Sequence, residues 1–305
     1  MSELHAWLSA PFAPEHRFLW RALLMCALLG ASASLLGCVL VVRRLSLLGD
    51  ALAHSLLPGV GLAWLMFGTS LGALFIGGLA AGLLTALGSG VLSRLTRVKE
   101  DASFAGLFLT LFALGVALVS RVGTPVDLLH VRFGNILGIT SADLWLAASV
   151  ASLTVAAFAL FYRSILIECF DPSYHRACGG RGALTHLGLL ALTVLNLVAA
   201  LHALGGVLAL GLFMLPAVTA YLWCDRWGAM LAFSMVYCVV GGALGLLLSV
   251  PTALASGPCM VGVLGIGFLL SAVLSPRHGL LGRLLRPQHH HQEHGEEQCE
   301  LPHRH

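Results

Sequence analysis

Long apolar stretches alternate with short polar or Pro/Gly-containing joints along most of the chain. A helix needs about 20 mostly apolar residues to cross a bilayer, and nine stretches approach that length. They run over residues 18–42, 47–67, 71–92, 102–120, 142–161, 184–204, 207–223, 229–250 and 260–274. The second and seventh are marginal. The pattern predicts an all-α, polytopic integral membrane protein with eight or nine transmembrane helices.

Composition excludes an ordinary soluble protein. Hydrophobic residues make up 58% of the 305 residues and charged residues 10%, against about 25% charged in an average soluble domain. The eight cysteines are scattered without a CxxC pair, so they indicate neither a disulfide framework nor a zinc module. We expect a surface-lying segment over residues 1–17, a transmembrane domain over residues 18–275 and a cytoplasmic, disordered tail over residues 276–305.

The positions of the basic residues favour one orientation, because Lys and Arg accumulate in cytoplasmic loops. With the N-terminus outside and the C-terminus inside, thirteen basic residues fall in cytoplasmic joints and four in outer joints. The net charge of +3 is small and concentrated at the ends of segments. It therefore indicates orientation in a lipid bilayer and gives no reason to expect nucleic acid as a partner.

The second apolar stretch contains a carboxylate and an imidazole four residues apart, Asp50 and His54. On a helix this spacing places both on one face, and both groups are ligands for divalent transition metals. Charges in the bilayer are costly and usually face an interior pathway, and Gly49 and Pro58 flank the pair. The alternative is a helix-capping Asp50 near the cytoplasmic interface and a buried, hydrogen-bonded His54.

Several motifs carry a family resemblance that extends over about residues 18–275. They read RRLSLLGDALAHSLLPGV at 43–60, KEDA at 99–102, VDLLH at 126–130, FGNILG at 133–138, FDP at 170–172 and LPAVTA at 215–220. In order and spacing they resemble the manganese/zinc/iron permease family of ABC transporters. The resemblance implies the metal-permease ABC importer fold, and it assigns Asp50 and His54 as metal ligands.

The same resemblance implies a transporter subunit of the bacterial cytoplasmic (inner) membrane, with no catalytic residues of its own. It would move Mn²⁺, Zn²⁺ or Fe²⁺ and hold no permanently bound cofactor. The chain lacks the phosphate-binding motif GxxxxGK[ST], since its single lysine, Lys99, lies outside such a context. The expected partners are therefore an ATP-binding cassette ATPase, an extracytoplasmic metal-binding protein and a second permease copy or a paralogue.

A polar segment over residues 168–181 is the candidate contact with the ATPase. Asp171 before Pro172 is a helix-start signal, and Gly179 with the next glycine is a stop signal. A short helix parallel to the membrane fits between them, and it resembles the coupling helix of such permeases. Phe170, Asp171, Pro172 and Gly179 are the residues assigned to this role; the alternative is an ordinary connecting loop.

For the other polar residues, a structural role is favoured over a role in transport. Glu100 with Asp101, and separately Asp143, open predicted spans, where acidic side chains favour the positive helix terminus. Asp127 and His130 precede a turn on the outer side, where a solvated loop competes with a role in docking or gating. His202, in the same stretch as Asn196, is expected to be a hydrogen-bonded polar group of the core.

The last 18 residues are rich in histidine and acidic residues and poor in apolar ones, so we expect disorder. His/Cys-rich tracts bind transition metals, which makes this tail a candidate cytosolic metal buffer or sensor; a tail without function is the alternative. The candidate ligands are His289, His290, His291, His294, Cys299, His303 and His305.

Two other transport functions and one enzymatic function compete with an ABC metal permease. A stand-alone, gradient-driven metal transporter usually carries several intramembrane carboxylates, whereas Asp50 is the only clear one in this sequence. An ABC permease for a metal chelate would not need an Asp/His pair. A membrane metalloenzyme would need about three ligands and an acid/base group, such as HExxH, which the sequence lacks.

Overall fold

The computed structural model describes residues 17–45, 48–68, 70–122, 139–171, 174–175, 182–252 and 255–275. These residues form helices and no strand. The helices are α2 (Arg17–Val42), α3 (Leu48–Ser55), α4 (Leu57–Phe67), α5 (Leu71–Leu95), α6 (Glu100–Val122), α8 (Ser141–Phe170), α10 (Gly182–Leu204), α11 (Gly206–Trp223), α12 (Trp227–Thr252) and α13 (Ser256–Leu274).

Within the described residues, nine helical segments are long and apolar enough to span a membrane, with α3 and α4 counted as one. The prediction of an all-α polytopic membrane protein is therefore confirmed. Eight of the predicted spans each correspond to a single helix, and seven of these match it to within about four residues at each end. The exception in length is α8, which continues past the predicted end at residue 161 to Phe170 with a kink at Phe161. Glu168 therefore belongs to a helix and not to the predicted loop.

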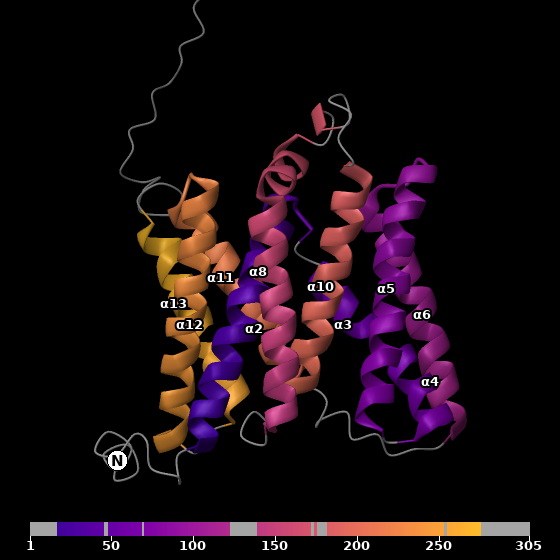
Figure 1. Ribbon diagram of the computed structural model, residues 1–305, viewed down its shortest axis with the longest axis horizontal. Coiled ribbons are helices and arrows are strands. Elements are labelled where there is room, and N and C mark those ends of the chain that lie inside the picture. Colours follow the sequence, from indigo (N-terminus) through magenta and orange to yellow (C-terminus); the bar gives the residue numbers. More distant parts are fainter. Residues whose placement is uncertain are drawn as a thin grey trace, which may run out of the picture.

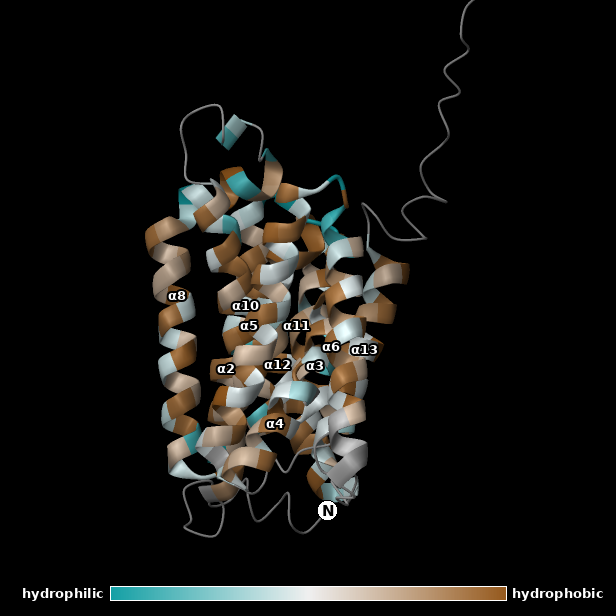
Figure 2. Ribbon diagram, turned by 90° about the vertical axis from the view of Figure 1, so that its right-hand side faces the viewer, coloured by the Kyte–Doolittle hydropathy of each residue, from teal (hydrophilic) through white to brown (hydrophobic). Residues whose placement is uncertain are grey.

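The helices stand side by side as an upright bundle (Figure 1). Helix α2 packs against α8, α10, α11 and α12, while α13 covers α11 and α12. On the other side, α4, α5 and α6 pack together and reach the rest of the bundle mainly through α5 and α10. Apolar residues predominate along the helices through the middle of the bundle (Figure 2). Large apolar side chains such as Ile76, Leu160 and Val236 are exposed, as expected for contact with lipid.

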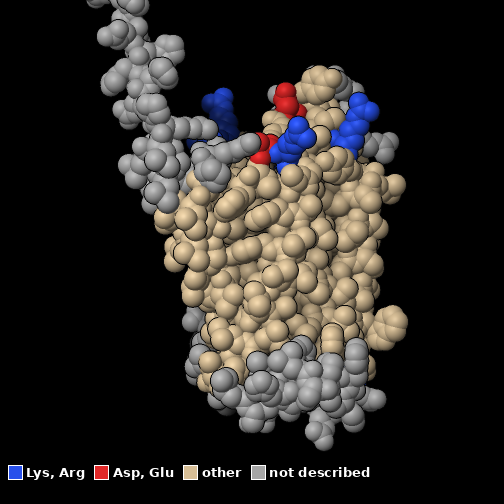
Figure 3. All heavy atoms as spheres, turned by 90° about the vertical axis from the view of Figure 1, so that its left-hand side faces the viewer, with Lys and Arg blue, Asp and Glu red and all other residues tan. Residues whose placement is uncertain are grey.

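Charged side chains gather at one end of the bundle (Figure 3). We call this the charged end; it includes the end of α2, the start of α6 and the end of α8. The opposite end includes the starts of α2 and α8 and the end of α10. Because cytoplasmic loops collect Lys and Arg, the charged end corresponds to the side expected to be cytoplasmic.

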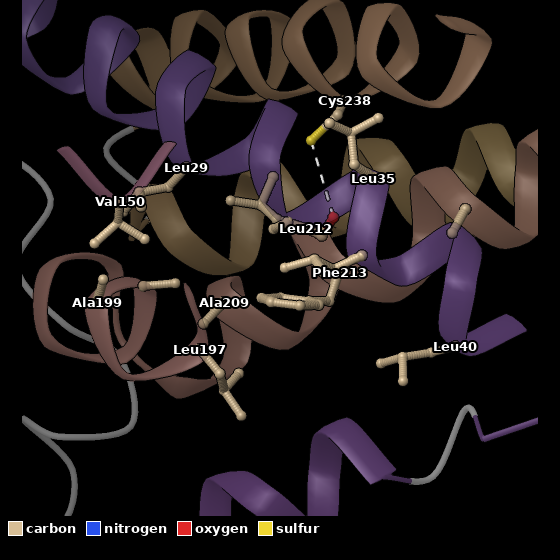
Figure 4. Packing of buried hydrophobic residues seen from close by; sticks show 14 of the residues in the cluster. Leu29, Leu35, Leu40, Val150, Leu197, Ala199, Ala209, Leu212, Phe213 and Cys238 are labelled. Atoms are coloured by element: carbon tan, nitrogen blue, oxygen red, sulfur yellow. Dashed lines mark hydrogen bonds between the residues drawn. The ribbon is translucent and has the colours of Figure 1, made fainter. Parts of the chain in front are cut away.

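The core lies where α2 meets α8, α10, α11 and α12. Figure 4 shows apolar side chains from these helices in contact, among them Leu29, Leu197 and Phe213. A Cβ added at Gly37 of α2 would lie 1.9 Å from the Phe213 carbonyl oxygen, so glycine is required for this close approach. The Cys238 thiol lies 4.0 Å from the Leu212 carbonyl and donates to it.

Helix α2 ends in a turn that redirects the chain at the charged end. The N–H of Leu45 donates to the Leu40 carbonyl at 2.8 Å, and the N–H of Arg44 to the Val41 carbonyl at 3.0 Å. This is the Schellman pattern of helix termination. Arg44 occupies its left-handed position with φ of 60°, where glycine is usual. The turn brings Arg43 to the end of α2 and releases the chain toward α3.

Candidate metal-ion site

Helix α3 lies about halfway between the two ends of the bundle (Figures 1 and 2). The depth of His54 can be estimated from its neighbours on α6. The centroid of its imidazole ring lies 6.3 Å from that of Phe108 and 6.1 Å from that of Phe112. These rings follow Glu100, which opens α6 at the charged end, by about 12 and 18 Å at a rise of 1.5 Å per residue. In a hydrocarbon core about 30 Å thick, His54 is therefore near mid-depth.

Asp50 and His54 lie together on one face of α3. Their nearest atoms, Asp50 Oδ1 and His54 Nε2, are 3.8 Å apart. The Asp50 side chain is 66% exposed and the His54 side chain 39% exposed in this single chain. Asp50 lies in the first turn of α3, at the depth of that helix, and His54 is not fully buried. A carboxylate and an imidazole, both metal-ligand types, therefore lie close together on α3 and are partly exposed in the single chain.

Helix α3 is short because the chain is interrupted at the next turn. Leu56 separates α3 from α4, and Pro58 is in the first turn of α4. Proline has no backbone N–H, so the carbonyl of His54 lacks its usual helical partner four residues ahead. Polar backbone at membrane depth is tolerated where protein or a water-filled cavity covers it. The interruption therefore leaves the His54 carbonyl without its regular α-helical N–H partner, close to the Asp50/His54 pair.

Small residues hold α4 tightly against α5 just beside this pair. A Cβ at Gly59 would lie 2.0 Å from the Gly77 carbonyl oxygen, and a Cβ at Gly77 would lie 2.4 Å from that of Gly59. Ala63 and Ala81 complete the crossing one turn further along each helix. Such small-xxx-small pairs allow helix backbones to approach closely in membranes. Helix α3 is thus attached to a rigid neighbour on its α4 side.

The pair is an incomplete metal site within one chain. Among the described residues, no group of three His, Cys, Asp or Glu side chains is arranged to hold a metal ion. A hollow of about 600 Å³ between α4 and α5 is lined by apolar residues such as Leu62, Met66 and Ile76, so it offers no metal ligands. Further ligands for an ion at Asp50 and His54 must come from backbone, water or another chain.

Sequence and structure comparisons place these features in a known family. The ABC 3 transport family matches residues 15–275, which include every described helix from α2 to α13. The chain belongs to the ABC 3 transport family. The family resemblance seen in the sequence motifs is therefore confirmed, and the chain is a multi-pass membrane subunit of the ABC transporter class.

Two curated relatives illustrate the range of the family. A manganese transport system membrane protein, MntC of Halalkalibacterium halodurans, is 37% identical over 273 residues, which cover 89% of this chain and 92% of the relative. A chelated iron transport system membrane protein, YfeD of Yersinia pestis, is 33% identical over 288 residues, covering 94% and 95%. Both similarities extend over essentially the whole transmembrane domain.

Two solved structures share the fold. PsaBC from Streptococcus pneumoniae in complex with Fab has a TM-score of 0.76 at 29% identity, covering 93% of this chain and 99% of that chain. An inward-facing putative metal-chelate type ABC transporter has a TM-score of 0.66 at 17% identity, covering 86% and 89%. The helix arrangement described above is therefore that of an ABC importer permease.

Two of the four residues predicted to contact the ATPase, Phe170 and Asp171, lie within the part of the chain that the structure describes. Phe170 is the last residue of α8, and its ring packs edge-on against Trp227 with centroids 5.9 Å apart. Asp171 Oδ1 accepts a hydrogen bond from the Tyr174 N–H at 2.9 Å, as expected for a helix-start residue. Pro172 and Gly179 lie outside the described residues.

The other polar residues singled out in the sequence have mainly structural contacts where they are described. Asp143 and Thr140 form a reciprocal capping box at the start of α8. His202 Nε2 lies 3.9 Å from Asp143 Oδ1, and the Asn196 side-chain amide donates to Thr154 Oγ1 at 2.7 Å. Asp127, His130 and the histidine-rich tail are outside the described residues.

Sequence reasoning missed a group of buried ionisable residues at the charged end. His186 of α10 is 2% exposed, and its Nε2 lies 2.9 Å from Glu100 Oε1. Glu168 of α8 is 3% exposed and accepts a hydrogen bond from His175 Nδ1 at 2.9 Å. Glu100 therefore does more than favour a helix start. A buried histidine between apolar positions was the only available signal, and it does not identify its partners.

Proposed function

We propose that this chain is the membrane-spanning permease of an ABC importer that moves a divalent transition metal ion across the bacterial cytoplasmic membrane. Asp50 and His54 would hold the ion transiently halfway across. The observation that carries this proposal is the placement of a carboxylate and an imidazole 3.8 Å apart on a mid-depth helix, with both side chains open on one side.

The open side of this pair supports a two-copy arrangement. A charged side chain at the bilayer centre costs at least about 2.5–3.5 kcal/mol when it faces lipid. Asp50, 66% exposed in the single chain, must therefore face water or protein. A second permease copy, or a paralogue, on that side would enclose a path and add its own ligands. The ion would then sit between two chains, each contributing part of its coordination.

Energy would come from ATPase subunits at the charged end. By the positive-inside rule this end faces the cytoplasm, and the segment that begins at Phe170 and Asp171 and continues through Pro172 and Gly179 would dock there. An extracytoplasmic metal-binding protein would deliver the ion to the opposite end. A gradient-driven mechanism has less support. Such transporters usually carry several intramembrane carboxylates, whereas α3 carries a single one at mid-depth, Asp50, among the described residues.

The transported species is proposed to be the bare ion, with manganese favoured over zinc and iron. The relatives MntC, MntB and ScaB are named as manganese transport proteins. The relative YfeD is named for chelated iron, which supports a metal chelate as the second candidate. The two differ chemically, because a chelate carries its own ligands and would tolerate loss of Asp50 or His54.

The test is ATP-dependent uptake of radioactive manganese and zinc by vesicles that contain the full complex of permease, ATPase and delivery protein. Asp50→Ala and His54→Ala are expected to abolish uptake of the bare ion while the complex still assembles. The matched controls change the same residue types elsewhere: Asp101→Ala at the exposed start of α6 and His202→Ala at the opposite end.

Each alternative has its own result in this assay. Uptake that persists without the ATPase would identify a gradient-driven or passive transporter. Uptake of a metal chelate that is unchanged in both site variants would identify a chelate permease. Unimpaired uptake of the bare ion by Asp50→Ala and His54→Ala would show that the pair is not the metal site.

The tail is proposed as a separate metal-binding element on the cytoplasmic side. Its six histidines and Cys299 are of ligand types that favour zinc, copper or nickel. It would act as a buffer for ions that have already crossed. Removing residues 288–305 should then lower zinc binding by the purified complex without changing the initial rate of uptake, whereas a slower initial rate would contradict a buffering role.

A further inference from the structure

Five side chains at the charged end form what we call the charged-end cluster: Arg43, Glu100, Glu168, His175 and His186. They come from the end of α2, the start of α6, the end of α8, the segment after α8 and the first turns of α10. The side chains of His186, Glu168 and His175 are less than 10% exposed, that of Arg43 is 14% exposed and that of Glu100 is 21% exposed. Ionisable groups are rarely buried in this way unless they are paired.

The contacts within the cluster join α2, α6 and α10. The guanidinium of Arg43 donates to His186 Nδ1 and lies 3.7 Å from Glu100 Oε2. Because a guanidinium can only donate, Nδ1 of His186 must accept, which leaves its proton on Nε2. Nε2 itself lies 2.9 Å from Glu100 Oε1, within ion-pair distance. His186 therefore connects a cation at the end of α2 with an anion at the start of α6.

Gly182 connects these contacts to the segment after α8. A Cβ at Gly182 would lie 2.7 Å from Glu168 Oε2 and 3.2 Å from His175 Nδ1, so the hydrogen-bonded Glu168–His175 pair rests directly on the first turn of α10. His186 follows Gly182 by four residues, which places it on the same face of α10. A continuous path of contacts thus runs from His175 through Gly182 and His186 to Arg43.

The cluster does not resemble a binding site. A cavity of about 140 Å³ is lined by Arg43, Arg94, Glu100, Glu168, His186, Ser93 and Gly182. Its two arginines balance its two glutamates, so it has no excess charge that would attract a cation or an anion. Buried ion pairs of this kind also add little to stability compared with apolar packing. What distinguishes the cluster is that it joins the ends of four helices, α2, α6, α8 and α10, at one place.

We propose that the charged-end cluster is a positioning device that couples movement of the segment after α8 to the helix that carries Asp50 and His54. Arg43 directly precedes the Arg44 turn, and α3 starts five residues after Arg43. Displacement of His175 would move Glu168 against α10, and His186 would then move the end of α2 and the start of α3. This inference rests on the proposed function, in which the segment after α8 contacts the ATPase.

The experiment measures metal ions moved per ATP hydrolysed, using radioactive manganese and the full complex in vesicles. Gly182→Ala removes no side chain of the cluster, but the new Cβ requires the Glu168 carboxylate to shift and the His175 ring to give way by a few tenths of an ångström. Gly188→Ala is its matched control, because it makes the same change in the same helix where nothing lies within 4 Å. Gly182 has no positive φ, so alanine is compatible with its backbone.

A second pair of variants tests the hydrogen bond itself. His175→Leu removes the donor to Glu168, and His175→Asn keeps a side-chain N–H near the position of Nδ1. We expect Gly182→Ala and His175→Leu to lower the number of ions moved per ATP by about five-fold or more, the lower range of allosteric coupling. ATP hydrolysis and manganese binding should persist, while His175→Asn and Gly188→Ala behave as wild type.

Three results would count against the inference or its premise. An unchanged ratio of ions to ATP in Gly182→Ala would overturn it. Uptake and ATP hydrolysis that fall in proportion would also overturn it, because they would show a role in assembly or stability alone. A wild-type complex without ATP-dependent uptake would instead overturn the proposed function, and this inference with it.

Discussion

The crossing of α4 and α5 makes a quantitative prediction about Gly59, which belongs to the signature motif beside the candidate site. In Gly59→Ala the new Cβ would lie 2.0 Å from the Gly77 carbonyl oxygen and 2.6 Å from the Ala81 Cβ. Real Cβ contacts stay beyond 3.0 Å, so the helices must separate by about 1 Å. The nearest atom is backbone, which cannot rotate away as a side chain would.

The magnitude follows from two opposing effects. Overpacking costs about 1–3 kcal/mol, and the rigid backbone contact places Gly59→Ala at the upper end. Alanine gains about 1 kcal/mol over glycine in a helix interior. The net loss in free energy of unfolding should be about 2 kcal/mol. The control, Gly106→Ala in α6, has nothing within 4 Å of the new Cβ, so it should keep the gain of about 1 kcal/mol.

The assay is denaturant or thermal unfolding of the detergent-solubilised chain, with the two variants compared in one detergent. Gly59→Ala and Gly77→Ala open the same gap, so the double variant should cost clearly less than the sum of the two single variants. If Gly59→Ala is as stable as Gly106→Ala, the close crossing is wrong, and with it the rigid support that we assign to α3.

Two further predictions concern helix ends. Arg44→Gly should raise the free energy of unfolding by about 0.5–1 kcal/mol, because glycine removes the left-handed strain at φ 60° at some cost in chain entropy; Arg44→Ala, which keeps the strain, should give no gain in the same unfolding assay. Thr140→Ala should lower it by about 1 kcal/mol through loss of the capping box with Asp143, whereas Thr110→Ala, within an exposed helix, should have little effect.

The membrane spans could be predicted from the sequence because they depend on local composition. Each span needs only enough consecutive apolar residues, and the structure places most ends within a few residues of the prediction. The extension of α8 to Phe170 was missed because Arg163 marks a membrane boundary in the sequence. A long arginine side chain can extend along a helix toward water, so the apolar run from Ile165 to Ile167 could continue the helix.

The candidate pair could also be identified from the sequence, but its depth could not. Spacing alone places Asp50 and His54 on one face, and Asp50 follows Arg43 by only seven residues, which suggested the interface as an alternative. The structure shows α3 about halfway between the two ends of the bundle (Figure 1), although Leu48 follows the end of α2 at Val42 by only six residues. This depth depends on packing of α3 against α6, α5 and α10, which are distant in the sequence.

The charged-end cluster shows where prediction from sequence stops. Arg43 and His186 are 143 residues apart in the chain, and no local pattern joins them. Glu100 at the start of α6 has a sufficient local explanation in the helix dipole, so its contact with His186 gave no signal. Partners brought together by packing of distant helices can be found only once those helices are placed relative to one another.

An incomplete site in each chain suits a transporter, because an ion held by a full ligand set would leave slowly. If two copies share one ion, a single defective copy should disable the pair. Mixing wild-type chains with Asp50→Ala chains during assembly should then give uptake that falls with the square of the wild-type fraction. Uptake that falls in direct proportion would mean that each complex uses one copy of this chain, or that each copy forms an independent site. Two different tags, one on each kind of chain, would verify that both are incorporated equally, so that the quadratic and the linear dependence can be told apart.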